Sequence, residues 1–307
     1  MPTVHLLTKN NFKTIKRCLD SIQWADRILI ADLGSTDETL KICEQYTNEI
    51  THLKCNRNEA RNYLISETQG PTFYIEPWEA LAQGVESLNN ITQNTYASVL
   101  HNKTITKEIR AWSGSPKFVN PVYETIDDSG AESDILFYSS GRQDHADIIE
   151  GVRKWKEKCP TSIAPYYYEA CTYLSIGQWQ QFLKLSEHYM FLDKSTSMSA
   201  MMNRYYYSLV NMVHLKKLRP VLQNMSLCLS VKPLMSEFWC LAADAHYHIN
   251  KRFDIAKQLY ENAIILGSKR LKNDKWPMDL TKYKSYPSKM IESCDALLSN
   301  KSLYVSF

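Results

Sequence analysis

Charged side chains follow two apolar runs in the first third of the sequence, where they could bind a charged ligand. Asp32 ends the run "RILIAD" and Glu76 ends the run "FYIE". Carboxylates that follow buried strands can accept hydrogen bonds from a base or ribose, or share a divalent cation with substrate phosphates. Arg61, in "NRNEARN" between the two runs, could donate two hydrogen bonds to a phosphate. These residue types suit a nucleotide-like ligand.

Each of these residues also has an ordinary structural interpretation. Asp32 begins "DLGSTDET", in which Gly34 permits a tight turn, so the aspartate could simply belong to a strand-to-helix connection. Three arginines could meet a phosphate: Arg61, Arg110 and Arg142. An arginine is more often a surface residue or an ion-pair partner, and only Arg61 stands in a motif.

The elements that would position these side chains alternate between strands and helices. Apolar runs at residues 4–8, 27–32 and 73–76 predict strands, and apolar residues at helical spacing predict helices over 11–22 and 35–46. Strands that alternate with helices predict an α/β domain with a mostly parallel sheet over residues 1–150. Residues that follow such strands lie at the carboxyl edge of the sheet, where ligands bind.

Residues 151–307 contain long helical patterns and repeat internally. The copies align through three pairs of aromatic or apolar residues: Tyr173 with Trp179, Met212 with Leu218, and Tyr247 with Phe253. Their spacings are close to the period of tetratricopeptide helix pairs, about 34 residues. Ala245 and Ala256 would let paired helices approach closely. We favour a tetratricopeptide-like all-α domain over the alternative, a generic helical bundle.

The order of the motifs resembles that of family 2 glycosyltransferases with the GT-A fold. "TKNN", "DLGSTDET", "EARN", "EPWE" and "VYE" fall where the bacterial branch with tetratricopeptide repeats has "VKNE", "DTGSTD", "ARN", "DADE" and "VHE". That branch includes enzymes that glycosylate peptide side chains, such as the sublancin-type S-glycosyltransferases. The resemblance covers about residues 3–150 and extends into the repeats. It implies a GT-A-like domain at 1–150 followed by the repeat domain at 151–307.

The resemblance also implies roles for single residues. Thr8 would lie beside the nucleotide, Asp32 would contact its base, and Arg61 would lie near its phosphates. Asp37, in the same motif as Asp32, joins this nucleotide-sugar-binding set. Glu124 of "VYE" falls on the glutamate of "VHE" and is the candidate general base.

The metal position departs from the family pattern. Glu76–Glu79 fall on "DADE", so the first acid is kept as Glu76 while Trp78 stands at the last ligand position. Tyr123 and Ser139 stand where the family has histidines. The resemblance would place Mn²⁺ or Mg²⁺ at Glu76, but Glu-Pro-Trp predicts a weak or absent metal site. Trp78 could stack on a sugar or base, or be a core aromatic at a strand end.

Composition narrows the class of protein. The chain has 307 residues and a formal net charge of +3, which is too small to indicate nucleic acid as a partner. No apolar run is long enough to span a membrane, and the first residues do not resemble a signal peptide. Eight scattered cysteines are typical of a reducing compartment, so we expect a cytoplasmic protein.

Together these features predict a glycosyltransferase that moves a sugar from a nucleotide-sugar donor, with a UDP-sugar as the first expectation. By resemblance the reaction would be inverting. The acceptor would be a polypeptide or a glycan, and the repeats would hold this acceptor or a protein partner. The alternative is a degenerate relative that binds nucleotide or partners without catalysis, as a scaffold.

Overall fold

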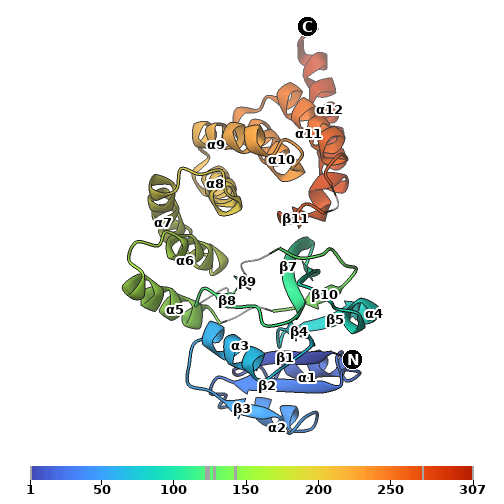
Figure 1. The fold of residues 1–307 in the computed structure, drawn as a ribbon. Coiled ribbons are helices and arrows are strands. Elements are labelled where there is room, and N and C mark those ends of the chain that lie inside the picture. The colour runs from blue at the N-terminus through green and yellow to red at the C-terminus, as the bar shows by residue number, and fades with distance from the viewer. Residues whose placement is uncertain (1, 122–124, 127–128, 142–143, 272, 306–307) are drawn as a thin grey trace. The chain divides into compact units, whose positions relative to one another are not determined.

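The computed structural model describes residues 2–121, 125–126, 129–141, 144–271 and 273–305. The chain forms two compact units, Met1–Trp155 and Lys156–Phe307 (Figure 1). The first unit is α/β and the second is built of helices, which confirms the predicted fold class. All eight cysteines lie in the described residues and are free thiols.

The N-terminal unit is built on one mixed sheet, with strand order β3-β2-β1-β4-β7-β6-β10-β5. The strands are β1 (Thr3–Thr8), β2 (Arg27–Asp32), β3 (Ile50–His52), β4 (Pro71–Ile75), β5 (Glu79–Gln83), β6 (Thr95–His101), β7 (Thr104–Ser113) and β10 (Leu136–Ser139). A separate ladder joins β8 (Phe118–Val119) to β9 (Thr125–Ile126). The predicted runs at 4–8, 27–32 and 73–76 correspond to β1, β2 and β4.

The neighbouring strands β3, β2, β1 and β4 run parallel and end at the same edge of the sheet. Their register sets Thr8 beside Asp32, and Asp32 beside His52. Leu6 pairs with Ile75, so Glu76 follows β4 at this same edge. Beyond β4 the direction changes, because β7 pairs antiparallel with both β4 and β6. The parallel register therefore gathers the predicted binding residues.

Helices cover both faces of this sheet, because successive strand residues point to opposite sides. These helices are α1 (Ile15–Asp20), α2 (Thr39–Cys43), α3 (Arg57–Ser66) and α4 (Val85–Asn89), and α5 (His145–Lys158) follows β10. Leu6 packs in one buried cluster with Ile15 of α1. Its neighbour Leu7 packs in another cluster with Ala60 and Leu64 of α3. This alternation fixes α3 against the sheet.

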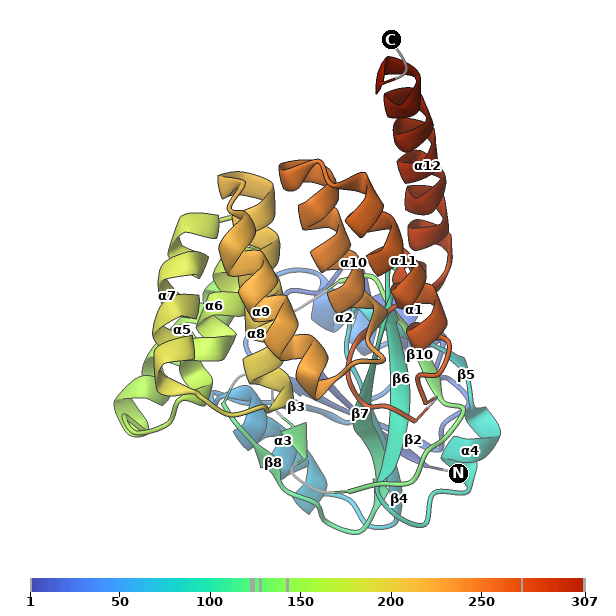
Figure 2. The same cartoon turned by 90° about the horizontal axis from the view of Figure 1, so that it is seen from above.

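The C-terminal unit consists of helix pairs, each helix in contact with the next along the chain (Figure 2). The pairs are α6 (Ala164–Ser175) with α7 (Trp179–Leu192), α8 (Met198–Val210) with α9 (Leu218–Val231), and α10 (Ser236–Ala245) with α11 (Phe253–Gly267). Short π-helical turns at Asn211–Leu215 and His246–Asn250 extend α8 and α10, and the last elements are β11 (Met278–Asp279), a 3-10 turn (Leu280–Tyr283) and α12 (Ser285–Val305). The tetratricopeptide-like organisation is confirmed.

The turn inside each helix pair repeats the same backbone feature. Gly177, Lys216 and Lys251 have positive φ values of 78°, 52° and 55°. Lys216 comes 39 residues after Gly177, and Lys251 comes 35 residues after Lys216. These are the spacings that align the sequence copies. A left-handed residue after a helix lets the chain reverse into the next helix.

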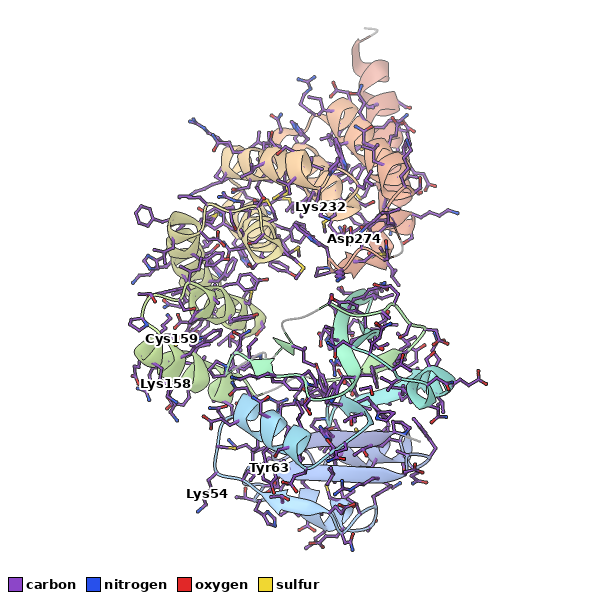
Figure 3. The ribbon with its side chains drawn as sticks, in the orientation of Figure 1. Lys54, Tyr63, Lys158, Cys159, Lys232 and Asp274 are labelled. Carbon is purple, nitrogen blue, oxygen red and sulfur yellow. The ribbon has the colours of Figure 1, made fainter. Side chains whose placement is uncertain are left out.

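Loops and the last helix are tied to α10 and α11 by polar contacts. The hydroxyls of Tyr260 and Tyr286 both donate to Oδ1 of Asp244, at 2.5 and 2.6 Å, which anchors α12 to α10 and α11. Lys232 follows α9 and Asp274 follows α11, and Nζ of Lys232 lies 3.7 Å from Oδ1 of Asp274 (Figure 3). The N-terminal end of α12 is therefore packed against α10 and α11.

Candidate functional site

Asp32 is held rigidly at the carboxyl edge of the sheet. Its side chain is 2% exposed, and it accepts hydrogen bonds from the backbone N–H of Gly34 at 3.2 Å and of Ser35 at 3.1 Å. Gly34 has φ +96°, a conformation that favours glycine. Nδ1 of His52 lies 3.2 Å from Oδ2 of Asp32, and the imidazole is 68% exposed. The site therefore presents a fixed carboxylate beside an accessible imidazole.

Thr8, the last residue of β1, and Asp37, in the loop before α2, support the same edge. The hydroxyl of Thr8 donates to Oδ1 of Asn11 at 3.1 Å. Asp37 accepts from the backbone N–H of Thr39 at 3.0 Å and from that of Phe12 at 3.4 Å. Burial opposes ionisation of Asp37, but hydrogen bonds from the hydroxyl of Thr39 and from the backbone N–H groups of Thr39 and Phe12 outweigh it and lower its pKa. In the structure Asp37 fastens the start of α2 to the loop after β1, and its contact with a nucleotide stays a prediction.

The stretch Glu76–Glu79 is a tight turn between β4 and β5. The backbone N–H of Glu79 donates to the carbonyl of Glu76 at 2.9 Å, so Pro77 stands at the second position of the turn, which suits its fixed φ. The carboxylate of Glu79 accepts from the backbone N–H of Glu76 at 3.0 Å. The geometry of the turn thus explains why proline stands at this position, without reference to any ligand.

Glu76 is paired with two arginines of α3. Both of its carboxylate oxygens lie 2.8 Å from Nη2 of Arg57, and Oε1 also accepts from Nη2 of Arg61. Burial of Glu76 opposes ionisation, but the two guanidinium groups outweigh this effect and lower its pKa to about 2. The carboxylate is therefore ionised and already neutralised by protein.

Arg61 lies deeper than the resemblance implies. Its side chain is 0% exposed, and its guanidinium carbon lies 4.1 Å from the ring centre of Tyr74 and 5.6 Å from that of Phe118. A wholly buried guanidinium that faces Glu76 has a structural role in this state of the molecule. Its predicted contact with phosphate stays a prediction.

A second buried pair continues the cluster. Nη1 and Nη2 of Arg110, on β7, each lie 3.0 Å from one carboxylate oxygen of Glu79. Burial raises the pKa of Glu79, and this effect outweighs that of the Arg110 guanidinium, which lowers it. The Arg110 guanidinium carbon lies 4.4 Å from the ring centre of Tyr74. Tyr74 therefore contacts both Arg61 and Arg110, which joins the two ion pairs into one polar core.

Trp78 is half-buried and firmly held. Its carbonyl accepts hydrogen bonds from the backbone N–H of Ser140 at 3.0 Å and from Nη2 of Arg17 at 3.1 Å. A Cβ added to Gly141 would lie 2.7 Å from the Cβ of Trp78, so glycine is required for this close packing. The indole ring centre lies 5.9 Å from the guanidinium carbon of Arg57. Trp78 thus borders the Arg57–Glu76 pair.

Three residues that the sequence analysis associates with this site have no described position. Glu124, Tyr123 and Arg142 lie outside the described residues. Ser139, which replaces a family histidine, ends β10 and donates its hydroxyl to the carbonyl of Gly141 at 3.1 Å. The role of Glu124 as general base therefore rests on the resemblance alone.

The sequence interpretation missed two residues of this site, Arg57 and His52. Arg57 precedes Arg61 by four residues, and this spacing puts both on one face of a helix. His52 ends the short strand β3, which the apolar pattern did not predict. Without the strand, nothing in the sequence placed His52 next to Asp32.

The site combines the buried carboxylate of Asp32 with a cluster of guanidinium groups that pair with Glu76 and Glu79. Residues 3–78 match the family model of Glycosyl transferase family 2. This stretch contains Thr8, Asp32, Arg61 and Glu76, and its similarity to family 2 glycosyltransferases agrees with the sequence motifs. No curated protein matches the chain.

Solved structures that match the chain include helical proteins at low sequence identity. MamA from Desulfovibrio magneticus RS-1 is 14% identical, with 52% of this chain and 87% of that chain covered and a TM-score of 0.37. PcrH from Pseudomonas aeruginosa is 15% identical, with 43% and 91% covered and a TM-score of 0.36. The first TPR domain of human RPAP3 is 13% identical, with 45% and 98% covered and a TM-score of 0.33.

Proposed function

We propose that the chain transfers a sugar from a nucleotide-sugar donor to an acceptor. The observation that carries this proposal is the position of Asp32, because it lies in the stretch that matches family 2 and at the edge of the sheet where ligands bind. Its carboxylate is fixed by the backbone of Gly34 and Ser35, so the fold sets the position from which it could accept a hydrogen bond from a base.

The acceptor chemistry of Asp32 also narrows the choice of nucleotide. A carboxylate accepts hydrogen bonds and cannot donate them when ionised. Uracil, thymine and guanine present a ring N–H beside a carbonyl, whereas the donors of cytosine and adenine are exocyclic amino groups beside a ring nitrogen that accepts. His52, 3.2 Å from Asp32, could donate to that carbonyl. We therefore expect UDP-, dTDP- or GDP-sugars to bind, with UDP-sugars first.

The reaction would be a single inverting displacement. An acceptor group attacks the anomeric carbon of the sugar and gives its proton to a carboxylate, for which Glu124 is the candidate. The bond between the anomeric carbon and the diphosphate oxygen breaks, and the nucleoside diphosphate leaves with its electron pair. The repeat unit would hold the acceptor, for which a polypeptide is our first candidate and a glycan the second, or a protein partner.

One observation favours a second function, nucleotide or partner binding without catalysis. The carboxylate of Glu76 is engaged by Arg57 and Arg61, which leaves the turn unlike the metal-binding element of the family. A protein that had lost transfer could still keep Asp32 and bind nucleotide.

A two-stage experiment separates these functions. Thermal stabilisation of the full chain by UDP, dTDP, GDP, CDP and ADP, each with EDTA or manganese, tests binding. A hydrolysis screen over UDP-, dTDP- and GDP-sugars then tests turnover. Stabilisation with hydrolysis supports the transferase, and stabilisation without hydrolysis or transfer to any polypeptide or glycan supports the binding protein. No stabilisation by any nucleotide would refute both the transferase and the nucleotide-binding protein.

Among the described residues, no helix combines the length and apolar character needed to cross a membrane. Cytoplasmic location stays a prediction.

A further inference from the structure

We propose that the guanidinium of Arg57 contacts the diphosphate of the donor in the place that a divalent cation takes in metal-dependent enzymes. The inference rests on the proposed function and deepens it, because it names the positive group that faces the leaving phosphates. It also accounts for the tryptophan that stands at a ligand position in "EPWE".

The oxygen atoms of this turn do not fit a metal ion. Both oxygens of Glu76 lie 2.8 Å from Arg57, and both oxygens of Glu79 lie 3.0 Å from Arg110. Magnesium and manganese need several oxygen ligands in regular geometry, and here the cation would stand next to guanidinium charges. Within the described ranges, no three histidine, cysteine or acidic side chains gather as a metal site would require. No step of the reaction is therefore assigned to a metal.

Exposure distinguishes Arg57 from the other arginines of the cluster. Its side chain is 12% exposed, whereas that of Arg61 is 0% and that of Arg110 is 5% exposed. Arg57 is also the first residue of α3, directly after the N-cap Asn56, at the carboxyl edge of the sheet. A ligand bound at Asp32 would therefore meet Arg57 before it met the deeper guanidinium groups.

The indole ring of Trp78 also holds Arg57 in position. The guanidinium carbon lies 5.9 Å from the indole ring centre, a cation–π distance. Trp78 itself is held by Ser140 and packs against Gly141. Glu76 also holds the guanidinium, through its Nη2. A cation positioned by an acid and an aromatic face needs little reorganisation when phosphate binds.

The chemistry of guanidinium suits this task. It stays charged at every physiological pH and can donate two parallel hydrogen bonds to phosphate oxygens. As the bond to the anomeric carbon breaks, negative charge grows on the departing diphosphate, and Arg57 would stabilise it. Glu76 alone would repel the diphosphate, but Arg57 and Arg61 together outnumber its single charge.

The test compares affinities for UDP and for uridine by calorimetry, each in EDTA and in manganese. If GDP is the stronger ligand in the nucleotide screen, GDP and guanosine replace them. The variants are Arg57→Ala and Arg57→Lys. Arg153→Ala is the matched control, because Arg153 is an exposed arginine on α5 that pairs with Glu150.

We expect Arg57→Ala to weaken UDP binding about 10- to 100-fold, the range for hydrogen bonds to charged groups, while uridine affinity stays within about twofold. Arg57→Lys should fall between, because an ammonium keeps the charge and loses the paired geometry. Wild-type affinity for UDP should change less than about tenfold between EDTA and manganese. Arg153→Ala should match the wild type.

Three outcomes would overturn the inference. Equal losses for UDP and uridine in Arg57→Ala would make Arg57 a support of the site as a whole. Unchanged UDP affinity would exclude contact with phosphate, and a hundredfold gain of wild-type affinity with manganese would restore the metal. A wild type that binds no nucleotide refutes the proposed function itself, which is a different result. If Arg57→Ala unfolds, the double variant Arg57→Gln, Glu76→Gln replaces both charges by amides and serves the same comparison.

Discussion

Both carboxylate oxygens of Glu76 lie 2.8 Å from Nη2 of Arg57, inside the turn that follows β4. The pKa of Glu76 is lowered from 4.5 to about 2 because the nearby guanidinium groups outweigh the effect of burial. A carboxyl whose pKa is lower in the folded state stabilises the fold above its unfolded pKa. That contribution disappears as the pH falls from 4.5 toward 2.

Glu76→Gln should therefore cost stability at neutral pH and much less in acid. Removal of one partner from a buried ion pair typically costs about 3 kcal/mol, and we expect a loss of that order at pH 7. Urea unfolding followed by circular dichroism at several pH values gives the difference from wild type. That difference should shrink toward about pH 3. A pH-independent difference, or an equal loss in the exposed control Glu86→Gln, would contradict the assignment.

Asp32→Ala should abolish stabilisation by nucleoside diphosphates while leaving the fold intact. The loss of the hydrogen bonds to Gly34 and Ser35 should cost about 1 kcal/mol, which lowers the melting temperature only modestly. Glu44→Ala is the control, because Glu44 is an exposed acid at the end of α2 and should leave nucleotide stabilisation unchanged. Differential scanning fluorimetry with and without nucleotide measures both variants. Undiminished stabilisation in a folded Asp32→Ala protein would remove the basis of the proposed function.

Ala245→Phe should destabilise the repeat unit. Ala245 is 0% exposed in the cluster that α10 shares with α8 and α9, so a phenyl ring has no space there. Overpacking of this kind costs about 1–3 kcal/mol. Thermal melting of the full chain measures the effect, and Ile265→Phe is the control because Ile265 is 56% exposed on α11. Equal melting temperatures for the two variants would mean that α10 is less tightly packed than described.

Lys216→Gly and Lys251→Gly should each stabilise the repeat unit. Both lysines adopt left-handed backbone conformations, with φ of 52° and 55°, at positions where Gly177 serves the first pair. A side chain in this region costs about 1–2 kcal/mol, partly offset by the greater freedom of glycine in the unfolded chain, so a gain of about 0.5 kcal/mol is expected. Chemical denaturation measures it. Lys217→Gly, at φ −93°, should destabilise instead, and the opposite order would refute the interpretation.

Local patterns in the sequence determined much of the fold. The runs that became β1, β2 and β4 are apolar, and those of β1 and β2 are followed by helical spacing; these patterns depend only on neighbours along the chain. The spacings of 39 and 35 residues likewise predicted the helix pairs, because each pair repeats the same contacts. Asp32 could be placed at the carboxyl edge for the same reason, since a parallel strand carries its last residue there.

Tertiary structure alone decided what surrounds Glu76. Its partner Arg57 stands 19 residues before it on α3, and Arg110, which holds Glu79, stands 31 residues after Glu79 on β7. A charge in a sequence does not specify its partner, because the pairing depends on how α3 packs on the sheet and on the insertion of β7 beside β4. His52 reached Asp32 only through the register of a three-residue strand. Burial then made these pairings decisive, since an ionised group taken out of water must be matched by an opposite charge.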